Sequence, residues 1–192
     1  MQQADTRENL IIDPQQLISV QDVMARWVYS EIVDGHFSDL YSIDPAVDAI
    51  KVKRSAGISF DQLSDTERAI VFAEWSRVRA FFTQFLQRVE GYRIEQWHRE
   101  QVAILRVPPG VDPKHRDYPL LSLFFLTRAD DPTDPRNADK ERNVVCVDDP
   151  LTLGLHDGMH VILDGLHRAK TFLSSPALTT TPVYVPVPIA TE

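Results

Sequence analysis

The sequence predicts an α+β protein in which a helical N-terminal part packs on a mixed β-sheet. In the first 90 residues, apolar side chains recur at the three- and four-residue spacing of amphipathic helices. After Gly91 the pattern changes to short runs of β-forming residues, which turns rich in proline and glycine separate. One further helix interrupts the strands near the C-terminus. This order is typical of the α+β class, and we expect residues 1–90 and 91–192 to form one compact unit.

The composition is that of a folded protein with an acidic surface. A chain of 192 residues, 43% of them hydrophobic, is long and apolar enough to bury a core. The formal net charge of −8 argues against nucleic acid as a partner, because nucleic-acid-binding faces neutralise phosphates with lysine and arginine. A single cysteine, Cys146, excludes an internal disulfide and fits a reducing compartment. Residues 1–9 are polar and contain no apolar signal segment, so we expect a cytoplasmic protein without membrane association.

Three helices are predicted in the N-terminal part. Asp13 and Pro14 suit a helix start, and apolar residues at helical spacing follow as far as Ile32. A shorter helix is predicted over residues 45–52. The strongest helix signal begins at Ser64 and Glu67, which have the spacing of a capping box, and continues until Gly91. We interpret the aromatic stripe on this helix as core packing rather than a cofactor groove.

Strands are predicted over 92–97, 102–107, 118–126 and 143–147. The charged stretch 128–143 lacks apolar periodicity and is predicted to be a long loop, either a lid over a site or a surface insertion. A strand over 159–163 then leads into a short helix over 166–173. The last segment, 183–189, alternates in the manner of a strand. Because it carries Pro186 and Pro188, we expect it either to lie at an edge of the sheet or to leave the sheet there.

The connection between the 159–163 strand and the following helix carries a candidate anion site. We expect Asp164 to cap the helix and Gly165 to allow a sharp turn, so that backbone amides of the first helical turn face outward. His167 and Arg168 in that turn add a titratable ring and a forked cation, and we expect the ligand to be a phosphate group. The alternative is an ordinary strand-to-helix connection in which Arg168 pairs with a surface carboxylate.

The stretch V-I-L-D-G-L-H-R-A-K, residues 161–170, resembles the ParB/sulfiredoxin superfamily. Its motif is similar to the DGxHR form of the ParB-like free serine kinases, and the resemblance covers about residues 147–187. It implies a strand, a turn and a helix that hold nucleotide phosphates, with ATP or another nucleoside triphosphate and Mg²⁺ as cofactors. It also implies a kinase, a transferase that moves phosphate to a small hydroxylated substrate. The cofactor-binding residues implied are Asp164, Gly165, Leu166, His167 and Arg168.

Carboxylates near this motif are candidates for metal binding and catalysis. Asp148 and Asp149 end a predicted strand close to the motif, and with His167 they form the candidate catalytic set. A polar turn before Pro150 explains the same two aspartates equally well. Glu100 is an outside candidate. We expect no metal site made of histidines, because glycine and aspartate turns separate His156, His160 and His167.

Departures from the family pattern restrict the choice among its branches. Sulfiredoxin-like chemistry needs a cysteine where this chain has Leu166, and chromosome-partition proteins carry two arginines where it has His167 and Arg168. Two alternatives to a kinase stay open. One is a non-catalytic regulator that senses a nucleotide or binds another protein, and the other is a nucleotide-dependent DNA-binding or nuclease-like protein. The helical region is also a candidate surface for homodimer formation.

Overall fold

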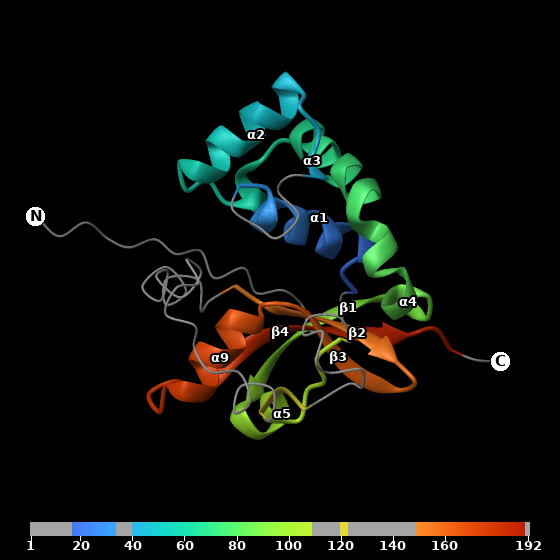
Figure 1. Ribbon diagram of the computed structural model, residues 1–192, viewed down its shortest axis with the longest axis vertical. Helices are drawn as coiled ribbons and strands as arrows, with labels where there is room; N and C mark the ends of the chain where they lie inside the picture. The colour runs from blue at the N-terminus through green and yellow to red at the C-terminus, as the bar shows by residue number, and fades with distance from the viewer. Residues whose placement is uncertain (1–16, 34–39, 109–119, 123–148, 191–192) are drawn as a thin grey trace, which may run out of the picture.

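The computed structural model describes residues 17–33, 40–108, 120–122 and 149–190 (Figure 1). Within these ranges the chain forms a helical first part and a four-stranded mixed sheet, which confirms the predicted combination of helices and sheet. The elements, in order, are α1 (Val20–Glu31), α2 (Pro45–Ser55), η2 (Phe60–Gln62), α3 (Asp65–Val78), η3 (Arg79–Phe81), α4 (Thr83–Leu86), β1 (Val89–His98), α5 (Arg99–Ala103), β2 (Leu151–His156), β3 (Met159–Asp164), α9 (Leu166–Ser174) and β4 (Thr180–Pro188).

The strands lie in the order β1-β4-β2-β3. β4 is antiparallel to β1 and parallel to β2, while β2 and β3 form an antiparallel hairpin. The hairpin turns at Asp157 and Gly158, both of which have positive φ angles, 48° and 75°. The turn of glycine and aspartate predicted between His156 and His160 is therefore confirmed, and so is the strand that leads to the candidate site.

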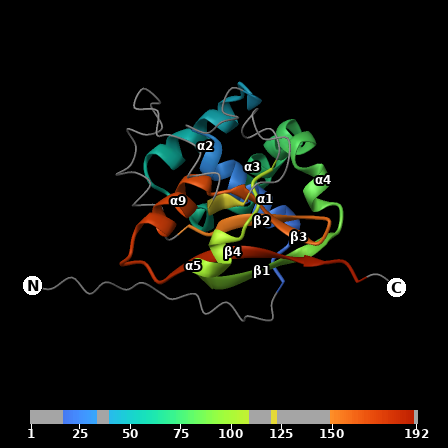
Figure 2. The same ribbon diagram turned by 60° about the horizontal axis from the view of Figure 1, so that its bottom comes forward.

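Both faces of the sheet contribute to a hydrophobic core, each against different helices, and β1 also has exposed residues on both faces. Tyr92 and Tyr184 belong to a core cluster with α1 and α3, whereas Trp97 and Val183 belong to a second cluster with α5 and α9. Adjacent residues such as Val183 and Tyr184 project to opposite faces of a strand, so the two residues join different core clusters. Figures 1 and 2 show α1, α2 and α3 grouped on one side of the strands.

The first helix starts later than predicted. The hydroxyl of Ser19 accepts a hydrogen bond from the Asp22 amide at 3.0 Å and forms the N-cap of α1. Ile18, before the cap, pairs with Tyr92 of β1 through two backbone hydrogen bonds. The prediction of helix at residues 17–19 is therefore wrong, because this segment joins the sheet. Residues Asp13 and Pro14 lie outside the described ranges.

The predicted capping box at the start of α3 is confirmed. Ser64 Oγ accepts from the Glu67 amide, and the Glu67 carboxylate accepts from the Ser64 amide. The prediction that this helical segment continues to Gly91 is wrong, because β1 already begins at Val89. Gly91 lies inside β1, where a Cβ atom would come within 2.9 Å of the Ile18 carbonyl oxygen.

A short helix, α5, takes the first two residues of the strand predicted over 102–107. α5 begins directly after β1, where the Gln101 side chain accepts a hydrogen bond from the His98 amide at 2.9 Å. This cap makes a helix the better local solution, and only Arg106 forms isolated strand bridges. The predicted strand over 143–147 and the loop over 128–143 lie outside the described residues, as does the 118–126 strand apart from residues 120–122.

The last strand is an interior strand, which corrects the prediction of an edge position. β4 pairs with β1 along its length, yet it pairs with β2 only at Val183 and Tyr184. Its three prolines are spaced by even numbers of residues, so their nitrogens face the same side of the strand. Continuous pairing with β1 requires that side to face away from β1. Since β2 covers only the middle of β4, the missing N–H groups cost little. The neighbouring strand β2 was not predicted.

Candidate functional site

The strand, glycine turn and helix predicted for the candidate site are present. β3 ends at Asp164, Gly165 adopts φ 89°, and α9 begins at Leu166. This left-handed conformation strongly favours glycine. The position is also crowded, because a Cβ atom on Gly165 would lie 2.6 Å from Leu151 Cδ2 and 3.0 Å from Arg168 Nη2. The guanidinium of Arg168 therefore packs directly over the turn.

Asp164 does not cap the helix, which corrects the prediction. The N-cap is Gly165, and the Asp164 carboxylate instead accepts a hydrogen bond from Arg168 Nη2 at 2.7 Å. The same Arg168 nitrogen donates to the Pro150 carbonyl at 3.2 Å. The side chains of Arg168 and Asp164 are 13% and 12% exposed, so this ion pair is largely buried. Arg168 thereby fastens the end of β3 to the start of β2.

A cavity of about 170 Å³ lies beside this bend, between the sheet and the helical region. Its floor comes from three strands. Thr152 of β2 pairs in register with Asp164 of β3 on one side and with Tyr184 of β4 on the other, and all three line the cavity. Residues paired across neighbouring strands project from the same face, so they form a polar row across the sheet.

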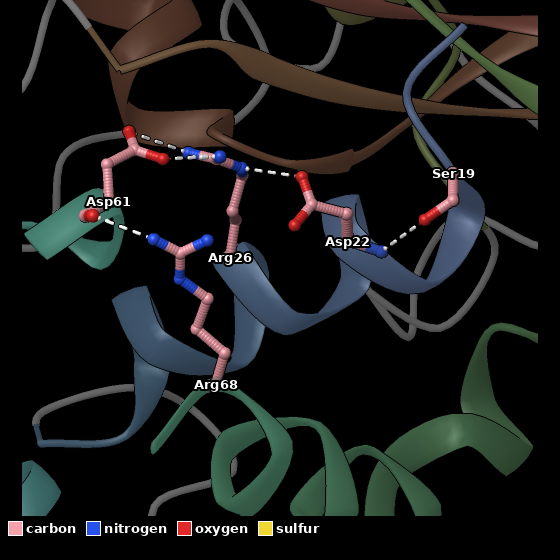
Figure 3. Close-up of polar contacts among 5 residues, drawn as sticks. All are labelled: Ser19, Asp22, Arg26, Asp61 and Arg68. Atoms are coloured by element: carbon pink, nitrogen blue, oxygen red, sulfur yellow. Dashed lines mark hydrogen bonds and ion pairs between the residues drawn. The ribbon is translucent and has the colours of Figure 1, made fainter. Parts of the chain in front are cut away.

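The opposite wall is a network of ion pairs around Arg26 of α1 (Figure 3). The Arg26 guanidinium donates to both carboxylate oxygens of Asp61, at 3.0 and 2.5 Å, and to Asp22 at 3.0 Å. Arg68 of α3 donates to the Asp61 backbone carbonyl at 2.8 Å. Both guanidinium groups lie over the ring of Phe60, that of Arg26 at 4.8 Å and that of Arg68 at 5.6 Å from the ring centre. The network fixes η2 against α1 and α3.

Titration behaviour in the cavity follows from these contacts. Burial alone would lower the pKa of Arg26, but its hydrogen bonds to Asp61 and Asp22 outweigh burial and the pKa lies above its usual range. The hydrogen bond from Arg26 lowers the pKa of Asp61, while burial raises the pKa of Tyr184. At neutral pH the wall therefore holds a fixed ion pair and the floor a neutral phenol.

Two charged residues at the cavity have no ion-pair partner among the described residues: Arg54 and Asp149. Arg54 lies in the last turn of α2, with its guanidinium 5.6 Å from the centre of the Tyr29 ring. Asp149 is exposed and precedes β2. Because neither side chain forms an ion pair with a described residue, each can bind a ligand group of opposite charge.

The predicted site residues are only partly brought together. Asp149, Asp164 and Arg168 line the cavity, whereas His167 is exposed in the first turn of α9 and is not part of the lining. Gly165 is buried under Arg168, and Leu166 packs into the second core cluster. Glu100 is exposed on α5, away from the cavity lining. Asp148 and Cys146 lie outside the described residues.

The structure adds lining residues that no sequence motif marked. Arg26, Arg54 and Asp61 come from the helical region, and Thr152 and Tyr184 come from strands. Arg26 lies in a predicted helix and Tyr184 in a predicted strand, whereas Thr152 lies in a strand that was not predicted. His156 lies in β2, His160 in β3 and His167 in α9, and among the described residues no group of three potential ligand side chains could hold a metal ion.

Within the described ranges, no helix combines the length and apolar character that a membrane span requires. Comparison of the chain with protein-family models, with curated proteins and with solved structures finds no match.

Proposed function

We propose that the chain binds a phosphorylated small molecule at the cavity beside Gly165. The proposed ligand is ATP or another nucleoside triphosphate, together with Mg²⁺. The observation that carries this proposal is the convergence on one cavity of the predicted DGLHR bend and two charged residues without ion-pair partners in the described part, Arg54 and Asp149. The resemblance to the ParB/sulfiredoxin superfamily supports the same ligand and a related fold.

Arg54 is the residue that we assign to the phosphate. Its forked guanidinium suits phosphate oxygens, and no described carboxylate competes for it. Arg26 and Arg168 line the same cavity but donate to Asp61 and Asp164, so they contribute position and local potential rather than the principal contact. This division of roles differs from the sequence-based hypothesis, in which Arg168 held the phosphate.

The size of the cavity limits what can enter it. Sites that enclose a whole drug-sized ligand typically have about 300–1,000 Å³. A cavity of about 170 Å³ holds a phosphate group or a comparably small molecule, and the nucleoside would extend outside it.

The residues present also fit a magnesium ion that accompanies the phosphates. Mg²⁺ is commonly held by one or two carboxylates together with phosphate oxygens and water. Asp61 and Asp164 are each engaged by an arginine, so Asp149 is the carboxylate that would hold the ion, which would offset phosphate charge.

Phosphate transfer to a small hydroxylated substrate is the activity that we propose for this site. In that step the acceptor oxygen bonds to the γ-phosphorus, the bond to the leaving diphosphate oxygen breaks, and the acceptor proton passes to a carboxylate. Asp149 is the carboxylate that we assign to this role, because Asp61 and Asp164 are each engaged by an arginine.

Calorimetry with ATP and MgCl₂ tests the binding. We expect Arg54→Ala to weaken binding at least tenfold, because a charge-assisted contact to phosphate is lost, and Arg88→Ala to bind as the wild type does. Arg88 is exposed and does not line the cavity, which makes it a matched control. No binding by the wild type, or equal binding by all three proteins, contradicts the proposal.

A second candidate, a nucleotide sensor without turnover, is favoured by one observation: His167 is not part of the cavity lining. Release of ADP in the presence of a panel of small hydroxylated compounds separates the two. A kinase gives acceptor-dependent ADP that Asp149→Asn reduces strongly, whereas a sensor binds ATP and gives none with any acceptor.

A further inference from the structure

A second hollow, of about 580 Å³, lies away from the site described above, on the side of the sheet that α5 covers. Its lining shares no residue with the first cavity. It is formed by the end of β1, by α5 and the segment after it, by Leu120 and by the start of β3. The volume falls within the range of about 300–1,000 Å³ that is typical of small-molecule sites.

The walls of this hollow are mainly apolar. Leu105 is 1% exposed and Trp97 is 6% exposed, so the deep part is anchored in the core. Ile104 and Met159, by contrast, are 68% and 36% exposed around the opening. Large apolar side chains around a concave opening are characteristic of binding sites, because their exposure to water is unfavourable until a ligand covers them.

Two rings in the hollow are held in defined orientations. The Trp97 indole N–H donates to Glu95 Oε2 at 2.9 Å, and the His160 ring lies edge-to-face with the indole at 5.5 Å between centroids. Burial lowers the pKa of His160, so at neutral pH its imidazole is uncharged. Two oriented rings of this kind offer a third aromatic ring the stacked and edge contacts that aromatic groups prefer.

We propose that this hollow binds a small molecule with a planar aromatic body, which contacts Trp97 and His160 and is covered at the opening by Ile104 and Met159. The Gln101 side chain and the Arg106 residue in the lining provide polar groups that can fix its orientation. Small-molecule sites typically have mainly apolar walls with a few polar groups, as this hollow does. This proposal does not depend on nucleotide binding at the other cavity.

The probe for the test is N-phenyl-1-naphthylamine, an uncharged aromatic compound whose fluorescence rises in apolar surroundings. We expect saturable binding with one site per chain, and at least tenfold weaker binding by Ile104→Asp and by Met159→Asp, which place a charge at the opening from two different elements. Val52→Asp is the matched control: Val52 on α2 is also 68% exposed, lies outside the hollow and receives the same charge. We expect it to bind as the wild type does.

Two results would overturn the assignment. The first is a wild-type protein that shows no saturable fluorescence change. The second is equal affinity in Ile104→Asp, Met159→Asp and Val52→Asp, since binding would then be independent of the hollow. Because both rim residues are exposed, their substitution leaves the buried core intact, and circular dichroism should show the same helix and strand content in all four proteins.

Discussion

Replacement of Gly165 with alanine is expected to destabilise the protein by about 2–5 kcal/mol, through two separable effects. The residue has φ 89°, and a left-handed conformation costs an L-residue about 1–2 kcal/mol. The new methyl group would also lie 2.6 Å from Leu151 Cδ2 and 3.0 Å from Arg168 Nη2. Leu151 is fully buried, so its methyl group has no solvent side to move into, and overpacking of this kind costs about 1–3 kcal/mol.

Gly158 provides the control that separates these effects. It has a similar φ of 75° in the neighbouring hairpin turn, but a Cβ atom there would meet no atom within 4 Å. Gly158→Ala should therefore cost only the backbone term, about 1–2 kcal/mol. Urea unfolding measures both, and a difference of about 1–3 kcal/mol between the two variants is expected. Equal destabilisation would refute the inference that Leu151 and Arg168 pack tightly over the turn.

The remaining predictions concern charged groups that hold the helical region together. Glu74 is 6% exposed and accepts a hydrogen bond from the Ser42 amide at 2.6 Å, so Glu74→Ala should cost about 1–3 kcal/mol in thermal or urea unfolding by leaving that amide unsatisfied. Arg77→Ala removes only the half-exposed partner of Glu74 and should cost at most about 1 kcal/mol; an equal loss in both variants would contradict the role of the amide. The Arg26 hydrogen bond lowers the pKa of Asp61 in the folded protein, so its stabilising effect is present above the unfolded value near 4 and is lost as pH falls through the lowered pKa. Urea midpoints at pH 7, 4 and 3 should therefore fall less steeply for Asp61→Asn than for the wild type. Glu67, whose pKa the Lys53 hydrogen bond lowers to about 2, titrates in both proteins and cancels from the comparison; parallel profiles would contradict the assignment.

The parts of the candidate site that could be predicted from the sequence are those that depend on neighbouring residues. The turn at Gly165, the preceding strand and the following helix were predicted because glycine, β-forming runs and helical spacing act over a few residues. The capping box of Ser64 and Glu67 is a local interaction of the same kind. The role of Asp164 was predicted wrongly although its partner Arg168 is only four residues away. At that spacing a charge-assisted bond to a guanidinium competes with the helix cap, and here it prevails.

The other features were decided by tertiary structure. Ile18 pairs with Tyr92 of β1 and is not part of the predicted helix. β4 is an interior strand although it contains prolines, and this is possible because β2 pairs with only two of its residues. The cavity itself joins residues 26, 54, 61, 149, 152 and 184, which no spacing rule relates. The sequence pattern shows which side chains are apolar and which nearby groups can form the hydrogen bonds of a turn or a helix cap. Which distant side chains then meet depends on how helices and strands pack across one another, and in this chain that packing places Arg54 and Asp149 at the same cavity as the DGLHR bend.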